Sequence, residues 1–520
     1  MESDSSSPKG NSRSASKVLD DEQAKVAFAR FRREKKVVVH CHGVFDLLHR
    51  GHVEHLEEAK AKGEILIVSV TSDEHVNKGP GRPVFPVEVR ALMVAALEVV
   101  DYVWISRHPT AEPAIEIVRP AYFVKGPDYV DLSADVTGNI QKELDAVKKN
   151  GGVVVFTEAP AMSSSTLINA TGLAHSEQLT QWLGKVRGLV SEKDIDGWFS
   201  EMQSLKVLVI GETIVDRYVF CEALGKTSKD PVLAFLKGGQ EDQLGGAVAV
   251  ARHIAGLGAS ATLLTRLGMD EAGKQTKGLV ENAVGVSGVF QQSADTQTIV
   301  KTRFVDEGSG AKVFETYEMS DEPATKKLDD EFCELLDGIL DDFDLILVAD
   351  YGHGLLSEQV VQRLARAKGT VAVNTQSNAG NRGFNSISRY PRVDIVSLNG
   401  SEVQLELKQR HTIVSELMPR LGHDLGAQWV VVTEGAGGLA LWGPKQGVTQ
   451  MPAFTEEVRD RVGAGDALFA VVAVLLQVGA STEGVGLFGN LAGASMVSDI
   501  GNRRTAHAPA LIRHAKIALK

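Results

Sequence analysis

Short apolar runs that alternate with helical stretches are the feature that most constrains the fold of this chain. Residues 37–46, 65–73 and 101–106 are typical of buried strands, and the stretches between them carry apolar residues at helical spacing. The alternation continues through AYFVKGPD and a helix at 137–149 to GVVVFTEA. Strands joined by helices pair in parallel, because a parallel neighbour requires a long crossover. We therefore expect an α/β fold built on a doubly wound parallel sheet.

The alternation ends near residue 170 and starts again at KVLVIGETIVDRYVF, residues 206–220. Further strand-like runs follow in FDLILVADYG, TVAVNTQ, VDIVSLNG and WVVVTEGAGG. A second α/β domain is therefore expected in this 520-residue chain. The predicted organisation is a disordered Ser-rich tail at 1–19, a first domain at 35–170, a helical linker at 171–203, and a second domain at 204–520.

Composition argues against several classes of protein. A formal net charge of -12 argues against a general nucleic-acid binder or a binder of anionic membranes. No run approaches the roughly 18 consecutive apolar residues that a membrane helix needs. Cys41, Cys221 and Cys333 are too far apart in the sequence for a disulfide framework or a compact metal knuckle. We expect a cytoplasmic protein without a nucleic-acid partner, a membrane partner or a protein-held metal site.

The segment HGVFDLLHRGH, residues 42–52, carries the sharpest chemical signal in the first domain. Gly43 follows an apolar strand and lets a phosphate approach the backbone. His49 and His52 open a helix and lie three residues apart, so they share one face. Two imidazoles at a helix N-terminus can stabilise the negative charge that develops on an α-phosphate during nucleotidyl transfer. The alternative is a pair of surface histidines with no such role.

The HxGH pattern with GxFD ahead of it resembles the nucleotidyltransferase superfamily of cytidylyltransferases and related adenylyltransferases. The resemblance covers about 130 residues and implies that the two histidines contact the triphosphate. It implies further nucleotide contacts from Gly43, Phe45, Asp46, Lys78, Arg82, Arg90, Ser164, Ser165 and Thr166. It also places Lys125 and Asp128 of the KGPD segment near the acceptor substrate. Alone, each basic residue could be a solvated side chain, and the SSST segment a polar turn.

The second domain carries RDRVGAGDALFA at residues 459–470. Glycines before a helix allow backbone N–H groups to converge on an anion, and this implicates Gly463, Ala464 and Gly465. Asp466 lies at the helix start, where its carboxylate could accept the proton of an attacking hydroxyl. The alternative is a Gly-rich turn whose aspartate only caps the helix.

The order of GETIVDRY, LGGAVAVA, VADYGHG, SLNGSEVQL and VTEGAGG resembles that of the ribokinase-like sugar kinases, over nearly all of residues 206–510. The resemblance implies that Asn399 and Glu402 form the N-x-x-E element linked to Mg²⁺ and phosphate. It implies that Asp216 holds sugar hydroxyls. The remaining implied contacts are Gly245 and Gly246 for the substrate, and Thr433, Glu434 and Gly435 for the nucleotide.

The second domain departs from this pattern at four places. Ala249 stands where the family has an asparagine that touches the sugar. Asn374 to Ser377 replace the usual D-P-x-x element and are followed by NAGNRGFN. Glu315 stands where the heptose kinases have an arginine, and Arg461 replaces a small threonine. These changes leave the sugar specificity open and also leave open a non-catalytic, binding-only second domain.

Both domains in one chain resemble the bifunctional heptose kinase/adenylyltransferases of nucleotide-sugar synthesis, with the domain order reversed. This resemblance implies a sugar phosphate as substrate, ATP and Mg²⁺ for the kinase, ATP or CTP for the transferase, and a homodimer. The alternative is an active transferase beside a kinase-like domain that only binds a sugar or holds a dimer together.

Overall fold

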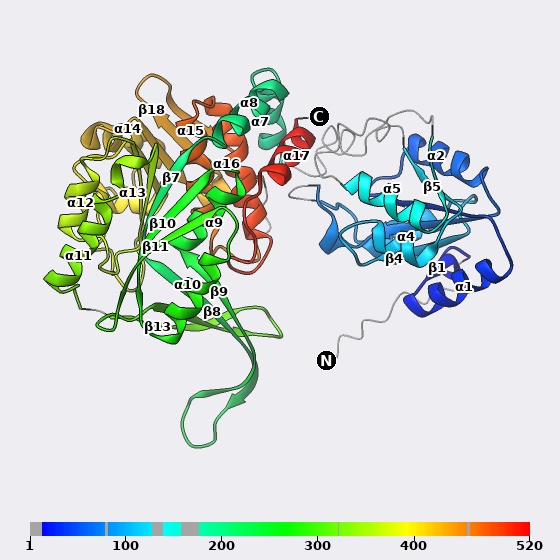
Figure 1. Ribbon diagram of the computed structural model, residues 1–520, viewed down its shortest axis with the longest axis horizontal. Coiled ribbons are helices and arrows are strands. Elements are labelled where there is room, and N and C mark those ends of the chain that lie inside the picture. The colour runs from blue at the N-terminus through cyan, green and yellow to red at the C-terminus, as the bar shows by residue number, and fades with distance from the viewer. Residues whose placement is uncertain are drawn as a thin grey trace. The chain divides into compact units, whose positions relative to one another are not determined.

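The computed structural model describes residues 13–78, 82–126, 139–157, 176–320, 322–454 and 458–519. Its contacts divide the chain into two compact units (Figure 1). The N-terminal unit comprises residues 1–180 and 516–520, and the C-terminal unit comprises residues 181–515. The division cuts two helices, α7 (Glu177–Val186) and α17 (Ala508–Ala518). Each unit is an α/β structure around its own sheet, which confirms the predicted fold class.

The N-terminal unit contains one six-stranded parallel sheet in the order β1-β4-β3-β2-β5-β6. Its strands are β1 (Val18–Leu19), β2 (Val38–Gly43), β3 (Ile65–Thr71), β4 (Tyr102–Ser106), β5 (Tyr122–Lys125) and β6 (Val153–Phe156). Its helices are α1 (Asp21–Arg33), α2 (Arg50–Lys60), α3 (Val87–Ala95), α4 (Glu112–Val118) and α5 (Asn139–Lys149).

Apolar cores cover both faces of this sheet, and successive residues of a strand point alternately into one core and the other. Val39 and Cys41 of β2 belong to a core with Leu56 of α2 and residues of α3. Val38 belongs to a second core with Phe28 of α1 and residues of α4. The continuous apolar runs in the sequence are thus explained by burial on two sides.

The start of this unit differs from the prediction in one respect. Val18 and Leu19 pair in parallel with Val103 and Trp104 of β4, so the end of the expected disordered tail is a sheet strand. Lys17 fixes this edge by donating hydrogen bonds from Nζ to the carbonyl oxygens of Leu97 and Val100, at 3.0 and 2.7 Å. Residues 1–12 lie outside the described residues.

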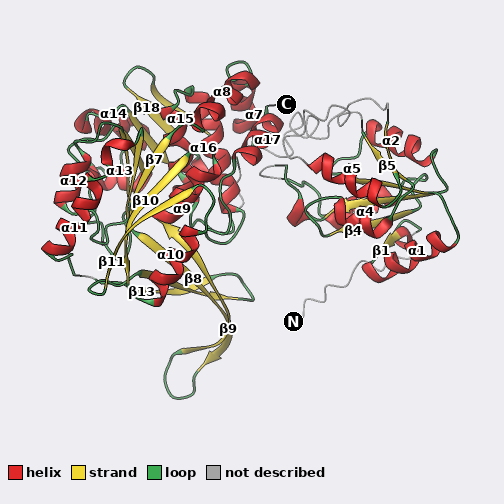
Figure 2. Cartoon of the chain, viewed as in Figure 1, coloured by secondary structure: helices red, strands yellow, loops and turns green. Residues whose placement is uncertain are grey.

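The C-terminal unit is built on a nine-stranded sheet in the order β11-β10-β7-β14-β15-β16-β17-β18-β19 (Figure 2). Seven strands from β11 to β17 run parallel, and β18 and β19 complete the sheet as antiparallel strands. The strands are β7 (Lys206–Gly211), β10 (Ser260–Gly268), β11 (Val286–Ser293), β14 (Leu345–Asp350), β15 (Thr370–Thr375), β16 (Ile395–Asn399), β17 (Trp429–Thr433), β18 (Leu439–Gly443) and β19 (Gly447–Met451).

A separate four-stranded sheet, in the order β13-β12-β8-β9, belongs to the same unit. The long β8–β9 hairpin projects from the body of the unit (Figure 1). The strands of this sheet are β8 (Thr213–Lys226), β9 (Leu233–Gly246), β12 (Ile299–Asp306) and β13 (Lys312–Glu318).

Helices cover both faces of the nine-stranded sheet (Figures 1 and 2). One face packs in a single apolar core against α11, α12, α13 and α14. On α8, within the predicted linker, Phe199 packs edge-on against Phe488 of α16 with ring centroids 5.1 Å apart. The helices are α8 (Glu192–Met202), α9 (Ala247–Gly256), α10 (Glu271–Glu281), α11 (Lys326–Asp337), α12 (Glu358–Leu364), α13 (Gly400–Glu406), α14 (Val414–Leu425), α15 (Ala464–Gln477) and α16 (Thr482–Val497).

Candidate functional site

The first candidate site lies where the chain reverses its winding across the N-terminal sheet. The central strand β2 has β3 on one side and β5 on the other, so the connections leaving β2 and β5 diverge. Open parallel sheets bind ligands at such a switch point, beyond the carboxyl ends of the strands. The loop that leaves β2 here contains Phe45 and Asp46 and ends at His49, the N-cap of α2.

The two motif histidines are brought together at the start of α2. Their rings stack with centroids 4.0 Å apart, and the ring of Phe45 packs 5.3 Å from that of His52. Nδ1 and Nε2 of His49 and Nδ1 of His52 are buried, with no hydrogen-bond partner among the residues that the structure describes. Buried polar atoms without partners are costly, so these nitrogens suit a ligand that supplies acceptors.

Burial keeps both imidazoles neutral. It lowers the pKa of His52 to about 3, with the neighbouring charges of His49 and Lys78 adding to the effect. The pKa of His49 is also lowered, first by burial and then by the charge of Lys78. A neutral imidazole carries one N–H donor, so each ring can give one hydrogen bond to a phosphate oxygen. Because the charge of Lys78 lowers the pKa of both histidines, Lys78 lies within electrostatic reach of both rings.

Asp46, Arg82 and Arg90 are held within the loop structure around the site. Asp46 is fully buried and accepts hydrogen bonds from the backbone N–H groups of Val84 and Phe85, at 2.8 and 3.2 Å. Arg82 pairs with this carboxylate at 3.3 Å. Arg90 is fully buried and donates to the carbonyl oxygens of three residues and to the carboxylate of Asp73; those carbonyls belong to Val44, Thr71 and Phe85. In this structure the three residues thus position the loops, and their contact with phosphate stays a prediction.

Lys125 ends β5, beside the carboxyl end of β2. It forms an ion pair with Glu143 of α5 and lies over the ring of Phe123, 5.6 Å from the centroid. The backbone of Gly43 lies against the ring of Phe45, and a Cβ at this position would lie 3.1 Å from that ring. The remaining predicted contacts, Asp128 and Ser164 to Thr166, lie outside the described residues.

The second candidate site lies in the C-terminal unit, where Asp216 of β8 is buried against the end of β9. Asp216 forms an ion pair with Arg303 of β12 and accepts a hydrogen bond from Asn502 Nδ2 at 3.1 Å. Gly245 permits this approach, because a Cβ at that position would overlap Asp216 Oδ2. Gly246 has φ +62°, a conformation that favours glycine. The predicted substrate residues thus form one cluster.

Asp466 lies in the first turn of α15 and reaches the same cluster. Tyr351, just after β14, donates a hydrogen bond from its hydroxyl to Asp466 Oδ1 at 2.7 Å. Burial raises the pKa of Asp466 to about 6; the Tyr351 hydrogen bond lowers it and the charge of Asp216 raises it. At pH 7 most of this carboxylate is ionised, as a general base requires. Two carboxylates 250 residues apart in the sequence are therefore close enough to interact electrostatically.

The glycines before α15 form a tight turn. Gly463 has φ +82°, and a Cβ there would overlap Asn502 Oδ1. At Gly465 a Cβ would meet nothing within 4 Å, so space remains beside the helix start, where Ala464 is the first residue of α15. An anion can approach the N-terminal amides of α15 through this space.

The N-x-x-E element forms a capping box at the start of α13. Asn399 Oδ1 accepts from the Glu402 N–H at 3.0 Å, and Glu402 Oε2 accepts from the Asn399 N–H at 2.8 Å. The other oxygen of Glu402 accepts from the Ser377 N–H at 2.8 Å. Burial raises the pKa of Glu402. The contact of this element with Mg²⁺ stays a prediction.

The predicted nucleotide residues Thr433, Glu434 and Gly435 follow the end of β17. Gly435 has φ +59°, and the Glu434 N–H donates to the Gly438 carbonyl at 2.9 Å, which closes a tight turn. This turn leaves the same carboxyl edge of the sheet as Asn399 of β16. Among the described residues, no hydrogen bond or ion pair joins this turn to the Asp216 cluster.

Sequence reasoning did not single out Tyr351, Arg303, Lys301, Glu212 or Asn502. Lys301 is 5 % exposed, and its ammonium lies over the ring of Tyr317, 5.1 Å from the centroid. Burial lowers its pKa, and the negative charge of Asp216 opposes this effect only in part. Glu212, at the end of β7, accepts from the N–H groups of Tyr351, His353 and Leu355 at 2.9 to 3.3 Å. Burial raises its pKa. Tyr351 lies within the VADYGHG motif, which could have identified it, whereas nothing in the local sequence marks Asn502.

Residues at three of the four places that depart from the kinase pattern are buried or bonded in the structure. Ala249 is buried in α9. Asn374 donates from Nδ2 to the Ser397 carbonyl at 2.8 Å. Glu315 lies 3.5 Å from Arg303 and accepts from the Tyr317 hydroxyl at 2.8 Å. Glu315 therefore places a negative charge beside Arg303, the partner of Asp216, where the resemblance to the heptose kinases implies a positive charge.

Among the described residues no group of three or more His, Cys, Asp or Glu side chains could hold a metal ion. The helices in the described part of the chain include none that is long and apolar enough to cross a membrane.

The chain matches two family profiles in succession. Residues 40–170 match the cytidylyltransferase-like family, and residues 204–509 match the pfkB family of carbohydrate kinases. It is 32% identical over 301 residues to the bifunctional protein HldE of Pseudomonas fluorescens, an alignment that covers 57% of this chain and 60% of that protein. It is 42% identical over 139 residues to the HldE of Methylococcus capsulatus, covering 26% and 28%. The chain thus spans at most 60% of the length of these relatives.

Among solved structures, phosphofructokinase-2 from Escherichia coli in complex with potassium aligns with a TM-score of 0.49 and 18% identity. That alignment covers 60% of this chain and 99% of the other. Since the pfkB profile alone matches more than half of the chain, the protein belongs to the pfkB family of carbohydrate kinases, with a cytidylyltransferase-like domain preceding the kinase domain.

Proposed function

We propose that the protein is a bifunctional enzyme of nucleotide-sugar synthesis. The C-terminal unit phosphorylates a sugar or sugar phosphate with ATP, and the N-terminal unit joins a nucleotidyl group from ATP or CTP to a sugar phosphate and releases pyrophosphate. The heptose-type substrate rests on the resemblance to bifunctional heptose kinase/adenylyltransferases. Further parts of the proposal are a cytoplasmic location, a homodimer, and the division into a first domain at 35–170, a linker at 171–203 and a kinase domain at 204–520.

The observation that carries the kinase activity is the convergence of Asp216 and Asp466. Asp216, oriented by Arg303 and Asn502, suits an acceptor hydroxyl, because a carboxylate fixed by two donors still presents lone pairs to a ligand. Asp466 then accepts the proton of that hydroxyl as the oxygen attacks the γ-phosphate. The amides at the start of α15 stabilise the charge of the phosphoryl group in transfer.

The N-x-x-E element at the start of α13 fits the usual mode in which Mg²⁺ binds at phosphates. In that mode one or two carboxylates and the substrate's phosphate oxygens hold the ion. Asn399 and Glu402 of the N-x-x-E element are the residues that would hold it, as the resemblance implies. Glu402 would do so through an oxygen that also accepts from a backbone N–H. The ion would supply neutralisation of charge on the phosphates.

In the N-terminal unit the pair of neutral imidazoles supports nucleotidyl transfer. His49 and His52 can each donate to the triphosphate as charge builds on the α-phosphate, and α2 contributes its N-terminal amides. Lys78 adds a positive charge near both rings. The acceptor's phosphate oxygen attacks the α-phosphate, and pyrophosphate leaves.

The experiment that tests the proposal measures two products from the intact protein. ADP release is followed with ATP, Mg²⁺ and a panel of sugars and sugar phosphates, and pyrophosphate release with ATP or CTP and sugar 1-phosphates. Asp466→Asn keeps the shape of the side chain but removes the base, so it should abolish acceptor-dependent ADP release and leave pyrophosphate release intact. If wild type binds a sugar but never releases ADP, the kinase-like domain is a binding module instead.

A further inference from the structure

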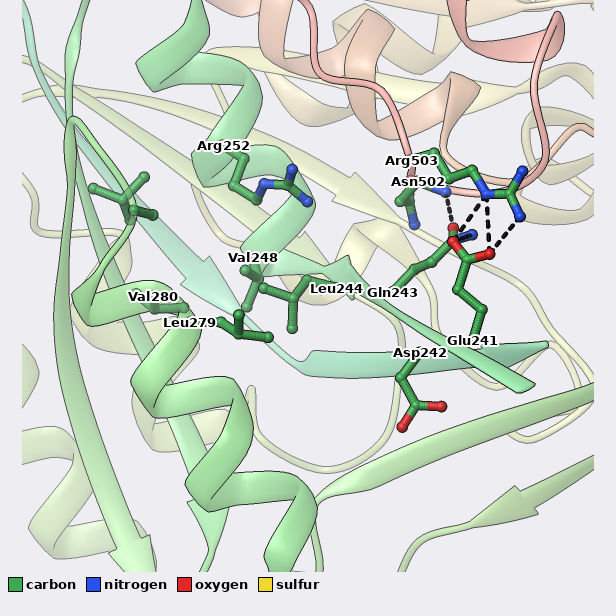
Figure 3. A pocket seen from close by; sticks show the side chains of 12 residues that line it. Glu241, Asp242, Gln243, Leu244, Val248, Arg252, Leu279, Val280, Asn502 and Arg503 are labelled. Carbon is green, nitrogen blue, oxygen red and sulfur yellow. Dashed lines mark hydrogen bonds and ion pairs between the residues drawn. The ribbon is translucent and has the colours of Figure 1, made fainter. Parts of the chain in front are cut away.

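A pocket with a volume of about 390 Å³ opens at the free edge of the four-stranded sheet (Figure 3). The edge strand β9, the first turns of α9 and the end of α10 form its walls. Leu244, Val248, Leu279 and Val280 give it an apolar lining. Leu279 is 57% exposed although it is a large apolar side chain. Apolar side chains make up half of the lining and polar or charged side chains the other half, a mixture that suits a small organic molecule with an apolar and a polar part.

Arg252 is the unusual polar residue of this pocket. It follows Val248 by one helical turn on the same face of α9, and Figure 3 shows its side chain on that side of the helix. It is half-buried, yet its guanidinium donates no hydrogen bond and forms no ion pair with any residue that the structure describes. Burial lowers its pKa, and no carboxylate opposes this effect. A desolvated cation without a partner is costly, and an anionic ligand would remove that cost.

The other charged groups at the rim already have partners. Arg503 donates from Nε to both carboxylate oxygens of Glu241, at 2.9 and 3.2 Å. Asp242 accepts two hydrogen bonds from Arg217, each at 2.8 Å. Arg252 is therefore the one charge in the pocket lining that has no opposite charge among the described residues, and the ligand that completes the site is an anion.

The pocket is separate from the acceptor cluster around Asp216, though it shares a wall with it. The wall is formed by Gln243 and Asn502, which are joined by a hydrogen bond of 2.6 Å from the Asn502 N–H to Gln243 Oε1. Asn502 turns its side-chain amide away to Asp216 and Gly463. Arg252 takes part in none of the interactions of the acceptor cluster.

We propose that this pocket binds a small organic anion, in which a carboxylate or a phosphate monoester pairs with Arg252 and an apolar body fills the space between β9, α9 and α10. Arginine presents a planar set of donors that matches either anion in a bidentate manner. The proposal depends on neither the kinase nor the transferase activity, so it stands or fails independently of the proposed function.

Isothermal titration of the full-length protein tests this proposal with a matched set of probes. The probes are 1-naphthoate, 1-naphthyl phosphate, the neutral 1-naphthamide, and inorganic phosphate. The variants are Arg252→Gln, which removes the charge, Arg252→Lys, which keeps it, and Ala283→Phe, which fills the pocket from its rim. Arg363→Gln is the control, because this arginine lies on α12 outside the pocket and pairs with Asp337.

At least one of the two naphthyl anions should bind wild type and Arg363→Gln at least about tenfold more tightly than the amide, with or without saturating ATP. Arg252→Gln should bind the anion at least about tenfold more weakly than wild type, and Arg252→Lys should keep part of the preference for anion over amide. Ala283→Phe should abolish binding while its thermal unfolding stays cooperative. Comparison of naphthoate with naphthyl phosphate identifies the anionic group. Equal affinity for acid and amide, unchanged affinity in Arg252→Gln, displacement by ATP, or no binding of any probe at millimolar concentration overturns the proposal.

Discussion

The hydrogen bond from Tyr351 to Asp466 gives a sharp prediction about the pH dependence of the kinase. Burial raises the pKa of Asp466 to about 6, and the Tyr351 hydroxyl, 2.7 Å away, lowers it by stabilising the ionised form. Tyr351→Phe removes that hydroxyl and little else. A hydrogen bond to a charged group contributes about 1.5–3 kcal/mol. Since 1.36 kcal/mol corresponds to one pH unit, the pKa of Asp466 in the variant should rise by about one to two units.

The sign of the effect follows from the role of a base. The base must be ionised, so kcat/KM for the acceptor is full above the pKa of Asp466 and falls as pH drops through it. In wild type this acid limb should lie near pH 6. In Tyr351→Phe it should lie about one to two units higher, which lowers kcat/KM about 2- to 10-fold at pH 7 and restores it near pH 9.

The assay is acceptor-dependent ADP release across pH 5 to 9 with a coupled readout. Tyr390→Phe is the matched control, because it removes another buried tyrosine hydroxyl, which donates to Asp350 at 2.6 Å rather than to Asp466. Its acid limb should coincide with that of wild type. An unmoved acid limb in Tyr351→Phe, or an equal loss of rate at every pH, would refute the assignment of Tyr351 as a positioning residue for the base.

Three further predictions address the other parts of the molecule. His52→Ala should lower kcat for pyrophosphate release about 10²-fold or more, whereas His75→Ala, whose ring bonds the Arg107 carbonyl, should leave it near wild type. Near-normal release from His52→Ala would remove the histidine from the mechanism. Gly245→Ala should raise the acceptor KM about tenfold or more, because the new Cβ overlaps Asp216. Gly239→Ala on the same strand should not raise it, because a Cβ there meets nothing closer than 3.9 Å. Equal KM values in the two variants would contradict this packing argument. A fragment that ends at residue 175 should stay soluble and release pyrophosphate, measured with the isolated fragment, and an inert fragment would mean that the units complete each other's sites.

The local sequence was sufficient to predict the two large sheets built from parallel strands and the two helix starts that carry the chemistry. Apolar runs at strand length, separated by helical spacing, determine that the strands are buried on both faces and joined by crossovers. The HxGH and GAGD motifs could be located because their parts lie within one helical turn, where spacing along the chain fixes geometry. His49 caps α2 and Asp466 lies in the first turn of α15, as the patterns indicate.

The acceptors that each basic residue binds could not be predicted in the same way. Arg82 and Arg90 were expected at phosphate, yet here they are engaged with Asp46, Asp73 and backbone carbonyls. A sequence does not show which acceptors the fold brings to a guanidinium. The strand at Val18 and Leu19 was missed for a related reason, since a two-residue edge strand has no periodicity and forms only because β4 offers its edge.

What the sequence determined by itself, then, are features whose atoms are neighbours along the chain: the long buried strands, the helix starts and the glycine turns. Only the tertiary structure decided that Asp216 of β8, Tyr351 after β14 and Asp466 of α15 meet in one cluster. The physical reason is that the order of strands in the sheets, and not spacing along the chain, sets which loops converge. Burial in that cluster then raises the pKa of Asp466, an effect that depends on surroundings contributed by distant segments.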